Sequence, residues 1–172
     1  MSEQVARMIR VDHAGEYGAV RIYAGQRAVL GRGPKAALLQ HMQEQEEQHL
    51  AAFSDVMVER RVRPTALLPL WHLAGFALGA ATAALGERAA MACTVAVEEA
   101  IDAHYAGQEA ELASAGDDEE ALSALIAKAR AEELEHRDIG LANEAERAPA
   151  YRLLSALIKG GCRVAIVLSE RI

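Results

Sequence analysis

A glutamate followed three residues later by a histidine occurs twice in this chain, and this repeated spacing constrains the fold more than any other feature. The two pairs are Glu46 with His49 and Glu133 with His136. Residues three apart in an α-helix project from the same face, so each pair can bind one metal ion. A single pair of this kind arises by chance in charged helices. Two pairs at corresponding places in the chain predict a metal site.

Each pair follows a helical stretch that carries a further glutamate. Glu16 lies thirty residues before Glu46, and the adjacent Glu98 and Glu99 lie about thirty-five residues before Glu133. One glutamate from each of two helices, with Glu-x-x-His from each of two others, is the ligand set of ferritin-like bundles that hold two metal ions. The spacing therefore predicts an all-α, ferritin-like four-helix bundle with a dinuclear site.

A second repeat distinguishes the two adjacent glutamates. The sequence Tyr-Ala-Gly-Gln begins at Tyr23, seven residues after Glu16, and again at Tyr105, seven residues after Glu98. Seven residues make about two helical turns, which returns the tyrosine to the face of the glutamate. We therefore interpret Glu98, rather than Glu99, as the ligand, and the two halves as a repeated helical hairpin. The predicted metal ligands are Glu16, Glu46, His49, Glu98, Glu133 and His136.

The types of ligand favour iron or manganese. Four carboxylates with one imidazole for each ion, and open positions for oxygen, differ from the cysteine-rich sites of structural zinc. Glu46 and Glu133 are expected to bridge the two ions. Burying four carboxylates without a cation would be costly, which argues against a purely structural role. The neighbouring glutamates are expected to face solvent: Glu47, Glu99, Glu132 and Glu135.

Length and composition agree with a single domain over residues 1–172. The chain is long enough to bury a core, and alanine, leucine, glutamate and arginine dominate while aromatic residues make up 4%. A net charge of −7 without a basic cluster excludes nucleic acid as the main partner. Cys93 and Cys162 are far apart and are predicted to be buried, unbridged residues of a reducing compartment. We expect no signal or transit peptide at the amino end.

Five helices and an amphipathic tail are expected, over residues 3–30, 34–61, 69–85, 87–115, 119–147 and 150–172. Pro34 suits the first turn of the second helix. Residues 116–118 are expected to form a turn, with Asp118 as the N-cap of the next helix. The tail carries basic residues beside its apolar ones, so it can either dock on the bundle or lie on an anionic membrane surface.

The segment over residues 65–86 differs from the rest because it contains no charged side chain. A helix over residues 69–85 would rise only about 25 Å, short of the roughly 30 Å of a hydrocarbon core. Trp71 would suit a boundary between membrane and water. Three alternatives therefore stand for this segment, namely an interfacial helix, a buried core helix and a membrane span.

Several longer motifs closely resemble the demethoxyubiquinone hydroxylases of ubiquinone biosynthesis. The resemblance covers essentially the whole chain. The motifs are VDHAGEYGA at 11–19, PLW at 69–71 with GFALG at 75–79, ACTVAVEE at 92–99, EELEHRDIGL at 132–141, and GCRVAI at 161–166 with LSER at 168–171.

This resemblance implies a ferritin-like di-iron monooxygenase with two iron ions (Fe²⁺/Fe³⁺) per chain. Its substrates would be O₂ and a polyprenylated 6-methoxy-3-methyl-benzoquinol, the demethoxyubiquinol, with NADH or another reductant supplying electrons. The family's ligands coincide with the six residues above, and its His-Tyr pair near the metals falls on His104 and Tyr105. From the residues alone, Tyr105 could equally fill space, and His104 is rotated off the ligand face.

The resemblance also implies a place in the cell and partners. Family members are peripheral membrane proteins, so the expected location is the cytoplasmic face of a bacterial inner membrane, or the mitochondrial inner membrane. Some members work with a lipid-binding partner protein. The main alternative is a small ferritin-like protein that oxidises and stores iron, and a further one is an assembly factor with a vestigial site. The uncharged segment at 65–86 favours the hydroxylase, since a soluble storage cage has little use for it.

Overall fold

The computed structural model describes residues 1–115 and 119–172, and within these residues the regular structure is entirely helical. The predicted all-α class is therefore confirmed. The predicted turn at 116–118 and the N-cap at Asp118 lie outside the described residues. The elements are α1 (Glu3–Leu30), α2 (Ala36–Glu59), α3 (Leu68–Ala84), α4 (Glu87–Ala115), α5 (Glu120–Ala142), the short 3-10 helix η2 (Ala145–Arg147) and α6 (Tyr151–Ser169).

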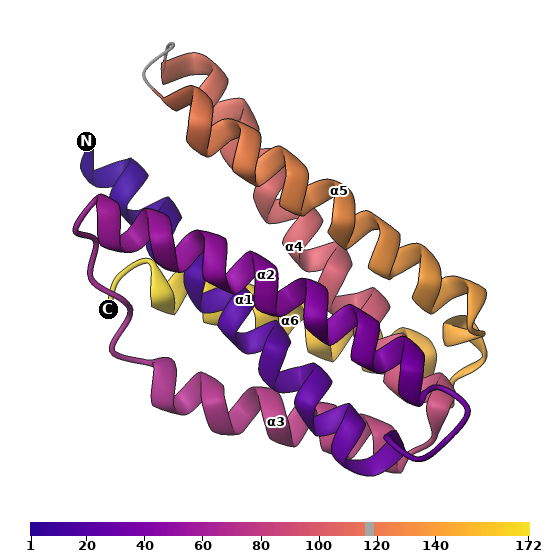
Figure 1. The fold of residues 1–172 in the computed structure, drawn as a ribbon. Helices are drawn as coiled ribbons and strands as arrows, with labels where there is room; N and C mark the ends of the chain where they lie inside the picture. Colours follow the sequence, from indigo (N-terminus) through magenta and orange to yellow (C-terminus); the bar gives the residue numbers. More distant parts are fainter. Residues whose placement is uncertain (116–118) are drawn as a thin grey trace.

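Two helical hairpins form the four-helix bundle. α1 packs on α2 and α4 packs on α5, as the internal repeat predicts. α3 packs mainly against α1, and α6 packs mainly against α4, so these two additional helices cover the face of the bundle that α1 and α4 form. Figure 1 views the bundle with α2 and α5 toward the reader and α6 behind them. The arrangement is consistent with the predicted ferritin-like bundle.

Two of the predicted helix limits are wrong. α2 begins at Ala36, which leaves Pro34 in the preceding turn, and α5 ends at Ala142 instead of near Arg147. α5 ends early because Glu144 adopts a left-handed backbone with φ of 63°. The side chain of Arg88 holds this residue, with Nε and Nη2 donating to Glu144 Oε2 at 2.9 and 2.7 Å.

Close contact between α1 and α3 depends on glycine. A Cβ atom on Gly79 would lie 1.9 Å from the carbonyl oxygen of Ile22, and one on Gly25 would lie 2.2 Å from that of Phe76. These backbones can approach only because neither position carries a side chain. A hydrogen-bond-length contact of 2.7 Å between the Tyr17 hydroxyl and His72 Nδ1 also joins the two helices. His72 therefore contributes a polar contact between α3 and α1.

The outer side of α3 is exposed, and the alternative of a fully buried core helix is therefore wrong. Leu70 and Leu73 are 51% and 69% exposed. In the described part of the chain, no helix has both the length and the apolar character that crossing a bilayer requires. The two covering helices are tied together at one end, where Trp71 Nε1 donates to Ser169 Oγ at 3.0 Å. We call the exposed outer sides of α3 and α6 the α3/α6 surface.

Both cysteines are free and contribute to the apolar cluster beneath α3 and α6, but the predicted burial is confirmed only for Cys93. Cys93 is fully buried and Cys162 partly so. Burial raises the pKa of the Cys93 thiol to about 12 and that of Cys162 to about 11. Since the thiolate is the reactive form, neither side chain is poised for chemistry at neutral pH.

Candidate metal centre

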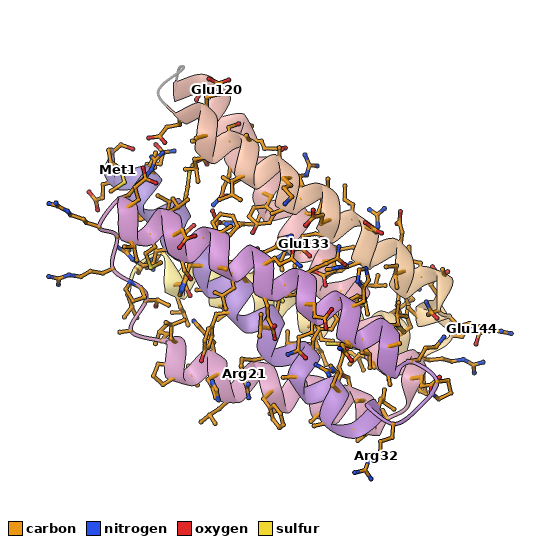
Figure 2. The ribbon with its side chains drawn as sticks, in the orientation of Figure 1. Met1, Arg21, Arg32, Glu120, Glu133 and Glu144 are labelled. Carbon is orange, nitrogen blue, oxygen red and sulfur yellow. The ribbon has the colours of Figure 1, made fainter. Side chains whose placement is uncertain are left out.

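The six side chains predicted as metal ligands converge in the middle of the bundle. α1 contributes one glutamate, α4 contributes one, and α2 and α5 each contribute a Glu-x-x-His pair. Figure 2 shows Glu133 midway along α5, beside α2. All six are buried, and the most exposed of them, His49, has 4% of its surface accessible. Apolar clusters pack on either side of the site, one containing Tyr105 and the other containing Tyr23.

The six residues form two overlapping groups. In each group the potential ligand atoms lie within 4.8 Å of one another. Glu16, Glu46, His49 and Glu133 make up one group, and Glu46, Glu98, Glu133 and His136 make up the other. Glu46 and Glu133 belong to both groups, which is the arrangement that bridging carboxylates require. His136 Nδ1 lies 3.0 Å from Glu46 Oε1, and His49 Nδ1 lies 3.3 Å from Glu133 Oε1.

The atoms that face the centre of this cluster lack hydrogen-bond partners. Burying a polar atom without a partner is costly, and natural proteins rarely do so. Eight such atoms occur here, and they are the ones that would ligate a metal. They are Glu16 Oε2, both carboxylate oxygens of Glu46 and of Glu133, Glu98 Oε2, and the Nδ1 atoms of His49 and His136. The donor set therefore fits a pair of divalent cations, whose bonds would satisfy these atoms.

The pKa values of the clustered side chains also favour bound cations. Burial raises the pKa values of Glu16 and Glu98 well above the usual range, and neighbouring carboxylates add to the effect. Burial acts likewise on Glu133, but the two histidines outweigh it and lower the pKa of this carboxyl to about 2. Burial would lower the pKa of His136, yet the carboxylates raise it to about 9. Four carboxylates thus compete for too little positive charge, which bound cations would supply.

The two repeated tyrosines each support the other half of the site. The Tyr23 hydroxyl donates to Glu98 Oε1 at 2.9 Å, and the Tyr105 hydroxyl donates to Glu16 Oε1. Burial and the nearby carboxylates raise the pKa values of both tyrosines well above the usual range, so both remain protonated donors at neutral pH. The helical spacing predicted that each tyrosine lies on the same face as the glutamate of its own helix. In the structure, each tyrosine instead donates its hydrogen bond to the glutamate of the other hairpin.

Sequence reasoning missed two residues that contact the histidines from outside. Glu132 Oε2 lies 2.5 Å from His49 Nε2, and Gln45 Oε1 lies 3.0 Å from His136 Nε2. The expectation that Glu132 faces solvent is therefore wrong, because its side chain reaches from α5 to α2. The available signal was positional: each of these residues immediately precedes the glutamate of a Glu-x-x-His pair. Glu99 also departs from the expectation, since it pairs with Lys159 of α6.

Comparison with known proteins identifies the family. The model of the family described as "Ubiquinone biosynthesis protein COQ7" matches residues 3–169. The chain belongs to this family. It is 60% identical over 169 residues to "3-demethoxyubiquinol 3-hydroxylase" of Rhodospirillum rubrum, covering 98% of this chain and 78% of the relative. The resemblance found from the sequence motifs is confirmed.

Eukaryotic members of the COQ7 family are also similar to this chain. The human "NADPH-dependent 3-demethoxyubiquinone 3-hydroxylase, mitochondrial" is 59% identical over 169 residues, covering 98% of this chain and 78% of the relative. The "5-demethoxyubiquinone hydroxylase, mitochondrial" of Saccharomyces cerevisiae is 44% identical over 180 residues, covering 96% of this chain and 77% of the relative. All three relatives carry names of hydroxylases acting on a demethoxyubiquinone or demethoxyubiquinol.

His104, which the resemblance singles out, lies outside the metal cluster of this COQ7-family chain. His104 Nε2 is 3.2 Å from Asp12 Oδ1, and Gln108 Nε2 donates to the same oxygen at 2.8 Å. Asp12 is 2% exposed, and burial raises its pKa. Sequence reasoning did not single out Asp12. A cavity of about 440 Å³ opens beside this group, lined by His104, Gln108 and residues of the two chain ends, among them Arg7 and Glu170.

Proposed function

We propose that this chain, as a single di-iron hydroxylase domain over residues 1–172, hydroxylates the ring of a polyprenylated demethoxyubiquinol with O₂. One observation carries the proposal: the buried cluster leaves eight potential ligand atoms without partners, in a chain 60% identical to a 3-demethoxyubiquinol 3-hydroxylase. The reaction inserts one oxygen atom into a ring C–H bond and reduces the other to water. It consumes two electrons and two protons, for which NADH or NADPH is the proposed source.

The proposed iron ligands are the six clustered residues, with Glu46 and Glu133 shared by both ions. Bound iron would supply the activation of O₂, which organic side chains do not achieve alone. The protein contributes a buried, preorganised site. Tyr105 holds Glu16 and Tyr23 holds Glu98 through hydrogen bonds, so these carboxylates have fixed orientations before metal binds.

For the family's His-Tyr pair we propose two separate roles. Tyr105 is proposed to position the ligand Glu16, whose carboxylate accepts its hydrogen bond. His104 is proposed to act from the wall of the cavity, because its side chain is 18% exposed and its Nε2 contacts Asp12. The two adjacent residues thus face different parts of the molecule, one the metal cluster and the other the surface.

A product assay tests the proposed reaction. The purified chain is loaded with Fe²⁺ without oxygen, mixed with a short-tailed demethoxyquinol and a reductant, and exposed to isotopically labelled O₂. We expect a quinone product that carries one labelled oxygen atom, detected by mass spectrometry. Unchanged quinone together with accumulated ferric iron on the protein would contradict the proposal and support iron oxidation and storage instead.

We further propose that the α3/α6 surface lies on a membrane, on the cytoplasmic face of a bacterial inner membrane or on the mitochondrial inner membrane. A polyprenyl quinol dissolves in the bilayer, so the enzyme must meet it there. Exposed apolar side chains on both helices support this orientation. They are Leu70, Leu73 and Phe76 on α3 and Leu153, Leu157, Val164 and Val167 on α6. The lipid-binding partner protein that the resemblance implies would also be expected to approach this surface.

The double variant Leu73→Glu with Leu157→Glu is expected to weaken binding to anionic phospholipid vesicles at least about tenfold, since burying a leucine contributes roughly 1.5–3 kcal/mol. Both side chains are more than 60% exposed, at 69% and 65%, so folding should be unaffected. Vesicle flotation measures the bound fraction. Val58→Glu is the matched control, because Val58 is 78% exposed and lies on α2, a helix that does not contribute to the α3/α6 surface. Equal loss in both proteins would contradict the proposed orientation.

A further inference from the structure

The two halves of the metal cluster are built from corresponding side chains. Each half has a glutamate held by a tyrosine of the other half, a shared glutamate and a histidine whose Nδ1 faces the centre. Each histidine also contacts, through Nε2, a residue of the facing helix. For His49 this residue is the carboxylate Glu132, whereas for His136 it is the amide Gln45. The outer partner of the histidine is thus a charged acceptor in one half and a neutral acceptor in the other.

These outer contacts determine what each imidazole offers to a metal. An acceptor on Nε2 retains the ring proton there and leaves the Nδ1 lone pair directed into the site. A carboxylate attracts that proton more strongly than an amide oxygen does, which makes the imidazole a stronger electron donor. Glu132 is 29% exposed, and its other oxygen lies 3.8 Å from Lys128 Nζ, so water and lysine moderate the effect without removing it.

We propose that Glu132 and Gln45 are positioning residues that make the two metal positions unequal. The ion on the His49 side, backed by a carboxylate, is bound more tightly and is the more stabilised in its higher oxidation state. The ion on the His136 side, backed by an amide, is the weaker and more exchangeable one. This inference rests on the proposed dinuclear site, and it assigns the inequality to one pair of side chains outside the ligand set.

Anaerobic calorimetric titration with Mn²⁺, a redox-stable probe, tests the inequality directly. The wild-type chain is expected to bind two ions in two steps whose affinities differ by about tenfold, the lower end of the 10–100-fold effect of such outer contacts. Glu132→Gln makes both outer partners amides, so the tighter step should weaken about tenfold and the two steps should converge. Gln45→Glu makes both partners carboxylates, so the weaker step should strengthen toward the tighter one.

Two further variants separate this role from simple effects of charge or packing. Glu135→Gln removes a carboxylate from the exposed face of the same helix and should leave both steps unchanged. The double variant Glu132→Gln with Gln45→Glu exchanges the two partners, so it should again bind two ions in two unequal steps. If the single variants acted only by disturbing the packing, the double variant would instead combine their losses of affinity. Mössbauer spectra of the ⁵⁷Fe-loaded proteins should show two distinct iron environments in the wild type that become more alike in each single variant.

Separate outcomes overturn this inference and the proposed function. Two equal binding steps in an active wild-type chain, or the same response of Glu132→Gln and Glu135→Gln, would overturn the inequality alone. A chain that binds no Mn²⁺ and no Fe²⁺ would overturn the dinuclear site, and the inequality with it. A chain with unequal steps but no labelled product would retain this inference and overturn the proposed reaction.

Discussion

Replacement of Glu133 by alanine is expected to remove the bound iron and abolish hydroxylation while the chain stays helical. Its two carboxylate oxygens face different histidines, with Oε1 lying 3.3 Å from His49 Nδ1 and Oε2 lying 3.5 Å from His136 Nδ1. Losing this side chain removes a proposed ligand from both ions at once. Turnover should therefore fall by more than the roughly 10–100-fold typical of changes around the ligands. His136→Ala should act in the same way through one ion.

Iron content per chain, product formation and far-ultraviolet circular dichroism measure these effects together. Glu135→Ala is the matched control, because Glu135 lies two residues farther along α5 on its exposed face. The control should retain iron, turnover and helical content. If Glu133→Ala still turned over substrate, the assignment of the site would be wrong. If it lost helical content together with iron, the residue would have to be regarded as structural.

Replacement of Gly79 by alanine is expected to destabilise the fold by about 3 kcal/mol, the upper end of the usual range for overpacking. The added Cβ would lie 1.9 Å from the carbonyl oxygen of Ile22, a backbone atom that cannot rotate away. α1 and α3 would therefore have to separate along their contact. For a chain of this size the Tm should fall by roughly 6–12 °C, which differential scanning calorimetry measures.

Gly107→Ala is expected to have the opposite effect on the stability of the fold. A Cβ at Gly107, on α4, would have no neighbour within 4 Å. Alanine there should stabilise the helix by about 0.5–1 kcal/mol, because glycine loses more backbone freedom on folding. Equal melting temperatures for Gly79→Ala and Gly107→Ala would mean that the close contact between α1 and α3 has no energetic weight.

The sequence was informative where the relevant signal was local. The four helices that carry the clustered glutamates and histidines could be predicted because Glu-x-x-His and the Tyr-Ala-Gly-Gln repeat follow the period of a single helix. The end of α5 could not be placed, because it depends on the left-handed backbone of Glu144 and on its contact with Arg88 from another helix. The sequence could narrow the segment at 65–86 to three alternatives, but only its packing against α1 revealed which side faces outward.

Contacts between helices could not be predicted from the sequence for a related reason. Glu132 was expected to be a solvent-facing neighbour of a ligand, since helical periodicity describes direction around one axis only. Whether the Glu132 side chain contacts His49 depends on how far α5 is displaced along α2. A displacement of a few ångströms is enough to make or break this contact. The same limit applies to Asp12 with His104, and to the crossed hydrogen bonds of Tyr23 and Tyr105.

The crossed tyrosines have a consequence for how this chain can change over time. Each of the two glutamates accepts a hydrogen bond from the tyrosine of the other hairpin, Glu16 from Tyr105 and Glu98 from Tyr23. The outer partners of the histidines cross in the same manner. The two hairpins of this single chain therefore contact each other as two subunits of a dimer would. A substitution at either tyrosine is therefore expected to change the orientation of the glutamate in the other hairpin, so neither half of the site is independent of the other.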